Sequence, residues 1–210
     1  MPCGQAATDA LAVTFGEEMA KLESAYKPLA ESVRRLIDAT IRTQVDIATL
    51  AAAKEKIDCI TEELSATVMP GSFGVRQFGD GQTMAWGNVM IGLRNPVAPP
   101  LAINHEADGL VWTDFALGAA YEGPPGHVHG GVCAMVLDHV LGATAHAPGR
   151  PAYTGTLSVR YLRGTPLGPL RAEAHVDRVE GVKTFASGHI TDAKGITVRA
   201  EGVFFHPRES

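Results

Sequence analysis

Hydrophobic residues in the first third of the chain recur at steps of three and four residues. Two such sets are Leu22, Tyr26, Leu29, Val33, Leu36, Ile37 and Ile41, and then Ile47, Leu50, Ile57, Ile60 and Leu64. This spacing is typical of amphipathic helices. Pro28 interrupts the first set and Asp46 precedes the second as a candidate N-cap. We therefore expect helices over 10–26, 28–45 and 47–66, with a role in packing or dimerisation.

The stretch "GSFGVRQFGDGQTMAWGNVMIGLRNPVAPP" at 71–100 is rich in glycine and proline and has no sustained periodicity. Such composition is typical of a linker or a segment that wraps around another element. The expected organisation is an N-terminal helical extension over 1–66, a linker over 67–87 and a second domain over 88–210.

Alternation of hydrophobic and polar residues dominates the rest of the chain and predicts strands. The alternating segments are "VWTDFALG", "TGTLSVRYL", "PLRAEAHVDRV" and "FASGHITDAKGITVRAEGVFF", the last with the turn signal "DAKG". Between the first two lies 131–147, which is apolar on every side and predicts a buried helix. The expected fold is α+β: a mostly antiparallel sheet wrapped around a central helix.

The predicted buried helix carries one carboxylate, Asp138, within the run "GGVCAMVLDHVLG". A buried carboxylate is costly unless it is hydrogen-bonded or used in chemistry. Gly130 and Gly131 lie at the helix start, where free N–H groups and the helix dipole favour a negatively charged oxygen. Gly131 and Asp138 are separated by roughly 10.5 Å at ~1.5 Å per residue, too far to act on one carbonyl. We therefore expect two copies to share each site in a homodimer or a dimer of dimers.

Charge and composition exclude several classes of protein. The net charge of −5 argues against a nucleic-acid binder, although basic residues outnumber acidic ones over 150–199, which suits a small polyanion. No segment has the apolar length of a membrane span or the pattern of a signal peptide, so we expect a soluble cytoplasmic protein without a membrane partner. Three widely spaced cysteines predict reduced thiols, with Cys133 as core filler.

His127 and His129 in "HVHGG" suggest metal binding, but no third ligand stands at a familiar spacing. The glycine and glutamate that flank histidines in cupins are missing, and there is no G-x-S-x-G elbow of a serine hydrolase. We expect neither a metal nor a bound cofactor.

"HGG" at 129–131, an aspartate nine residues after that histidine and the strand "TGTLSVRYLRGTPLG" resemble the hotdog-fold acyl-CoA thioesterases, in the branch of the phenylacetate-degradation thioesterase. The resemblance covers roughly 88–206. It implies a hotdog domain that hydrolyses acyl-CoA, with CoA present only as part of the substrate.

The resemblance also implies roles for individual residues. Asp138 would be the general base or nucleophile, the Gly130 amide would polarise the thioester carbonyl and His129 would brace the loop. Thr154 matches the position that orients the attacking water. Three basic residues match positions that meet the CoA phosphates: Arg160, Arg163 and Lys183.

Two positions depart from the family pattern. Gly123 stands where some relatives carry asparagine, which leaves Glu122 as a substitute carboxylate, and Gly164 replaces a usual proline. Two other functions stay open: a hotdog hydratase or dehydratase using His127 with Glu122, and a non-catalytic acyl-CoA sensor.

Overall fold

The computed structural model describes residues 4–77, 83–146 and 151–207. The chain forms two compact units, Met1–Val97 and Ala98–Ser210. The predicted linker, 67–87, and the first ten residues of the predicted second domain, 88–97, both fall within the first unit.

The first unit contains α1 (Gly4–Arg42), α2 (Ile47–Ser65) and a two-stranded antiparallel sheet of β1 (Arg76–Gln77) and β2 (Thr83–Met84). The predicted helix break at Pro28 is wrong, because α1 continues through this residue. A proline removes one helical hydrogen bond. On either side of it, Ala30 is buried and the Tyr26 ring packs against Trp86, so tertiary contacts hold both halves of the helix in line.

The predicted N-cap of α2 is confirmed. Asp46 Oδ1 accepts a hydrogen bond from Thr49 N at 2.8 Å, and this bond lowers the pKa of the Asp46 carboxyl. The glycine-rich segment after α2 wraps along α1: the Arg94 guanidinium lies 3.7 Å from the centre of the Tyr26 ring, and Arg34 donates to Asn95 O.

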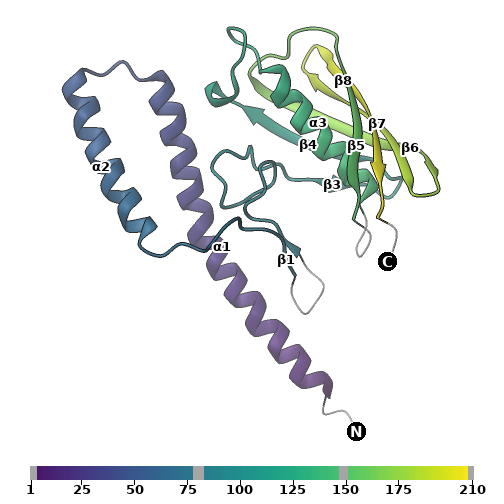
Figure 1. Ribbon diagram of the computed structural model, residues 1–210, viewed down its shortest axis with the longest axis horizontal. Helices are drawn as coiled ribbons and strands as arrows, with labels where there is room; N and C mark the ends of the chain where they lie inside the picture. The colour runs from purple at the N-terminus through teal and green to yellow at the C-terminus, as the bar shows by residue number, and fades with distance from the viewer. Residues whose placement is uncertain (1–3, 78–82, 147–150, 208–210) are drawn as a thin grey trace. The chain divides into compact units, whose positions relative to one another are not determined.

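The second unit has the expected α+β architecture, with one antiparallel sheet and the helix α3 (Gly130–Ala145) on one of its faces (Figure 1). The strand order is β3-β4-β6-β7-β8-β5. The strands are β3 (Asn104–His105), β4 (Val111–Leu117), β5 (Tyr153–Tyr161), β6 (Gly168–Glu180), β7 (Lys183–Asp192) and β8 (Gly195–Phe205). A 3₁₀ turn, Ala119–Tyr121, leads from β4 toward α3.

The core lies between α3 and the sheet. Four helix residues have no exposed surface: Val136, Leu137, Val140 and Leu141. They are opposed by alternate residues of the strands, which gives β4 the buried positions that its alternating sequence predicts. Gly188 and Gly202 let the helix approach the sheet. A Cβ atom would lie 2.7 Å from the Leu141 side chain at Gly188 and 3.2 Å from it at Gly202.

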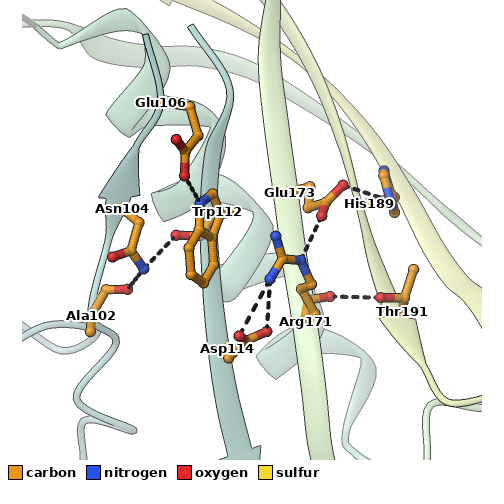
Figure 2. Close-up of polar contacts among 9 residues, drawn as sticks. All are labelled: Ala102, Asn104, Glu106, Trp112, Asp114, Arg171, Glu173, His189 and Thr191. Carbon is orange, nitrogen blue, oxygen red and sulfur yellow. Dashed lines mark hydrogen bonds and ion pairs between the residues drawn. The ribbon is translucent and has the colours of Figure 1, made fainter. Parts of the chain in front are cut away.

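The opposite face of the sheet carries a polar cluster across β4, β6 and β7 (Figure 2). The Arg171 guanidinium lies 4.2 Å from the Trp112 ring centre and pairs with Glu173 at 2.5 Å and Asp114 at 3.3 Å. Burial lowers the pKa of His189, which lies 3.7 Å from Glu173. The sheet is therefore apolar toward α3 and charged on its other side, as expected for a sheet with one covered face.

Among the described residues, none of the helices combines the length and the apolar composition that crossing a lipid bilayer requires.

Replacing Leu137 by alanine is expected to lower the free energy of unfolding by about 2–5 kcal/mol, because it leaves a cavity between α3 and the sheet. Urea unfolding followed by circular dichroism measures this loss. The matched control is Leu162→Ala, at a position 48% exposed in the same unit, for which we expect less than about 1 kcal/mol. Equal losses in the two variants would contradict the assigned core.

Candidate functional site

The helix α3 buries one face and leaves the other partly exposed. Met135 is 40% exposed, and Gly131 and Asp138 lie three to four residues from it on the same side. The sheet wraps around this helix as expected, since β4 to β8 all contact it, and only the side with Gly131 and Met135 stays uncovered. The uncovered face carries both groups that the sequence singled out.

Asp138 is held by the strand that follows the helix. Thr154 donates its hydroxyl hydrogen to Asp138 Oδ1 at 2.9 Å, which leaves the other carboxylate oxygen available. A β-bulge between Thr154 and Thr156 interrupts the pairing of β5 with β8 at this point. Bulges commonly re-aim a side chain, and Gly155 makes this one possible because a Cβ there would collide with Phe205.

The neighbouring imidazole, His139, is in a different environment. Burial lowers the pKa of His139, and the Asp138 charge offsets this shift only in part. The His139 ring is therefore neutral near pH 7. It places no positive charge beside the Asp138 carboxylate.

His129 is the N-cap of α3, with its Nδ1 accepting a hydrogen bond from Gly131 N at 3.0 Å. Because Nδ1 is the acceptor, the proton of the neutral ring is on Nε2. The Gly131 amide is thus occupied. Within the described part of the chain, the Gly130 N–H has no hydrogen-bond acceptor. Of the two glycines proposed at the helix start, Gly130 is the one that offers a free N–H group to a ligand.

Tyr161 also positions the helix start, although sequence reasoning missed it. Its hydroxyl donates to Gly130 O at 2.8 Å, and a Cβ at Gly130 would lie 3.3 Å from its ring. Partial burial raises the pKa of the Tyr161 phenol, which keeps it a donor at neutral pH. Thirty-one residues separate the partners, so only the fold brings them together.

The loop that precedes α3 is held by its own backbone. Gly123 N donates to His127 O and His129 N donates to Tyr121 O, both at 2.9 Å. The backbone of His129 passes so close to Gly123 that a Cβ there would lie 2.8 Å from His129 Cα. Glycine is therefore required at this position by the loop itself.

Glu122 and His127 are used within this loop. Glu122 Oε1 accepts from Gly126 N at 2.6 Å, and His127 Nδ1 lies 2.9 Å from Pro125 O. The His127 ring lies against Gly164, where a Cβ would come within 2.5 Å of its Cδ2, so this position favours glycine. No hydrogen bond joins Glu122 to His127 in the described residues, so the structure does not bring them together as a catalytic pair.

The three basic residues assigned to CoA phosphates lie in separate places. Arg163 forms two bonds with Asp192, at 2.5 and 2.8 Å, and donates to Gly195 O, so its charge is already neutralised. Arg160 is exposed on β5 opposite Arg199. Lys183 lies near the other end of the sheet, with its ammonium 5.4 Å from the Phe205 ring.

In the parts of the chain that the structure covers, no three His, Cys, Asp or Glu side chains lie close enough together to hold a metal ion. The thiol of Cys133 is buried in the core, and burial raises its pKa, as its expected role of core filler requires.

Comparisons with a family model and with solved structures both find thioesterases. The family model of the thioesterase superfamily matches residues 125–199. A crystal structure of a thioesterase superfamily protein is 34% identical and superposes with a TM-score of 0.77, covering 86% of this chain and 90% of that one.

Two curated relatives are similar over a shorter stretch. Human acyl-coenzyme A thioesterase THEM5 is 31% identical over 43% of this chain and 38% of its own length. THEM4 of Xenopus laevis, also an acyl-coenzyme A thioesterase, is 38% identical over 36% of this chain and 35% of its own length. The match thus spans well under half the length of these relatives.

The Arg163–Asp192 ion pair is expected to make the stability of the fold depend on pH in the acid range. The hydrogen bond from Arg163 lowers the pKa of Asp192 from 3.8 to about 2. A carboxylate whose pKa is lower in the folded state stabilises the fold above its unfolded pKa and loses that contribution as the pH falls. We expect Asp192→Asn to be less stable at pH 7 and to lose less stability between about pH 4 and 2 than the parent chain.

Urea unfolding at a series of pH values between 2 and 7 measures this difference. Glu201→Gln is the matched control, since Glu201 is an exposed carboxylate of the neighbouring strand. Parallel pH profiles for Asp192→Asn and the parent chain would show that this pair does not contribute to acid stability.

Proposed function

The chain belongs to the thioesterase superfamily, and we propose that it hydrolyses the thioester of an acyl-CoA to a carboxylic acid and free CoA. The observation that carries the proposal is the exposed face of α3. This face holds the Asp138 carboxylate, bonded to Thr154, and the helix start with the free Gly130 amide. The names of THEM5 and THEM4 as acyl-coenzyme A thioesterases support the substrate class.

In the proposed reaction, Asp138 takes a proton from water as the water oxygen attacks the thioester carbonyl carbon. The tetrahedral intermediate then expels the CoA thiolate, and the proton held by Asp138 passes to the leaving sulfur. Thr154 keeps the carboxylate in place, and its hydroxyl oxygen can still accept a hydrogen bond from the attacking water.

The intermediate carries its negative charge on the former carbonyl oxygen. The Gly130 N–H and the positive end of α3 stabilise this oxygen, and one such donor is typically worth about 2.7–4 kcal/mol. His129 and Tyr161 hold the helix start from two sides, by bonding Gly131 N and Gly130 O respectively. The amide is thus fixed before the substrate arrives, which is the condition for effective electrostatic catalysis.

One chain does not bring these groups to a single carbonyl, since Gly130 and Asp138 are about 12 Å apart along the helix at ~1.5 Å per residue. We place the site between two copies, with Gly130 of one chain facing Asp138 of the other. Two features support this arrangement: the uncovered face of α3, and β5 as an edge strand with exposed side chains along most of its length. An unpaired edge readily takes a strand from a second chain, and β5 also carries Thr154.

The CoA phosphates are expected to contact Arg160 rather than Arg163. Arg160 is exposed and lies opposite Arg199, so two positive charges stand side by side on β5 and β8. Phosphate groups favour such paired guanidinium groups.

Replacing Asp138 by asparagine is expected to lower the turnover of acyl-CoA by about a hundredfold or more, because the variant keeps the shape but loses the base. Release of free thiol from a panel of acyl-CoAs measures the rate. Asp108→Asn is the control, because Asp108 caps a turn through a bond to Leu110 N. If Asp138→Asn hydrolyses acyl-CoA at the parent rate, Asp138 has no part in the mechanism, and if it unfolds, the residue is structural.

Gly130 allows a sharper comparison. Gly130→Pro removes the N–H at the first helical position, where proline is well tolerated, and the extended backbone of His129 suits a following proline. Gly130→Ala places a similar Cβ beside Tyr161 but keeps the N–H. We expect the proline variant to lose about a hundredfold in turnover and the alanine variant to lose much less.

Mixing the Gly130→Pro and Asp138→Asn chains then tests the shared site. Half of the dimers in an equal mixture contain both chains, and each has one intact site, so about a quarter of the parent activity should return. Mass spectrometry of the intact dimers verifies subunit exchange. Exchanged dimers without activity would show that each chain builds its own site.

A further inference from the structure

The helix α2 carries a hydrophobic seam, defined here as Leu50, Ala53, Ile57, Ile60 and Leu64. Its members follow one another at alternating steps of three and four residues, the spacing of positions a and d in a coiled coil. No residue of α2 is buried, and Leu50, Ile60 and Leu64 are 45, 54 and 53% exposed. The seam therefore has no partner within the described chain that covers it.

The exposed apolar surface continues beyond the seam. Leu22, Leu29 and Leu36 repeat every seven residues on α1 and are also more than a third exposed. Leu29 and Leu64 both line a groove of about 880 Å³, whose other walls include Val33, Val68 and Met69. Contiguous apolar surface of this kind marks an association site, whereas scattered exposed leucines do not.

Charged residues beside the seam indicate what covers it. Lys56 and Glu63 flank the seam on the same side, at the two g positions of the heptad. In an antiparallel pair of α2 helices centred between Ile57 and Ile60, Lys56 of each chain lies opposite Glu63 of the other. The pairing is reciprocal, so a single two-fold axis gives two attractive contacts.

The other orientations lack this complementarity. In a parallel pair of α2 helices, Lys56 would face Thr61, which carries no charge. On the other side of the seam in the antiparallel pair, Lys54 of one chain faces Thr61 of the other. The Lys54 charge is already paired with Asp58 of its own helix. The antiparallel arrangement thus has two opposite-charge pairs and no like-charge pair.

We propose that α2 is a self-association surface, on which α2 of a second copy of this chain packs antiparallel through the seam, with two Lys56–Glu63 ion pairs. This contact uses residues of the first unit alone, and the proposed active site uses residues of the second. It holds whether or not the chain hydrolyses acyl-CoA.

Cysteine cross-linking in the full chain tests the contact and its direction. In a background with Cys3→Ser and Cys59→Ser, one chain carries Ile57→Cys and a differently tagged chain carries Ile60→Cys. The antiparallel pair places residue 57 of one chain opposite residue 60 of the other, so mild oxidation should link the two different chains. Each variant alone should give little disulfide, because like positions are then offset along the helices.

Charge reversal provides the second arm. Glu63→Lys is expected to slow cross-linking about tenfold, since two exposed attractive pairs become repulsive, and adding Lys56→Glu should restore the rate. Glu62→Lys is the matched control, because it makes the same change of charge on the side of α2 away from the seam. Circular dichroism checks that each variant remains helical.

Disulfides within single-variant samples would show a parallel pair and overturn the proposal. Absence of cross-links in the mixed sample would show that α2 does not meet a second α2. If Glu62→Lys slows cross-linking as much as Glu63→Lys does, the Lys56–Glu63 ion pairs do not hold the two helices together.

Discussion

The packing of α3 against one face of the sheet is the contact on which the rest of the second unit depends. Val136, Leu137, Val140 and Leu141 are fully buried, and the sheet supplies small residues where the helix comes closest. A helix this apolar has to be covered, and the sheet leaves only the side around Gly131 and Met135 exposed. This side carries Met135 and the groups that we assign to the site.

The rigidity of this packed helix also explains why the candidate site is spread out. A rigid helix holds the Gly130 amide and the Asp138 carboxylate at a fixed separation, and packing prevents either from moving toward the other. Each is then oriented by an element distant in sequence: Tyr161 bonds the helix start, and Thr154 bonds the carboxylate. Both come from the edge strand β5, so the strand that we propose to meet a second chain is also the one that orients the proposed site groups.

The sequence predicted most of this architecture because alternation and periodicity directly reflect which faces are buried. The strands β4 to β8 and the helix α3 were predictable in this way, and the Asp46 cap from its place before a periodic hydrophobic set. The predicted helix break at Pro28 was wrong, because tertiary contacts of Tyr26 and Ala30 override the local tendency of proline to end a helix. Tyr161 and the Arg163–Asp192 pair could not be foreseen, since contacts between residues about thirty positions apart leave no local pattern.

The two association surfaces that we propose differ in the kind of contact that they favour. The edge of β5 offers backbone N–H and C=O groups, which pair with almost any extended strand, so its specificity has to come from the side chains around it. The seam of α2 has no free backbone groups and depends wholly on side-chain shape and on the order of Lys56 and Glu63. A contact of the second kind discriminates against unrelated partners where the first kind does not. The proposed α2 contact would therefore let the chain leave a strand edge open near the proposed site and still select its own copy as the partner.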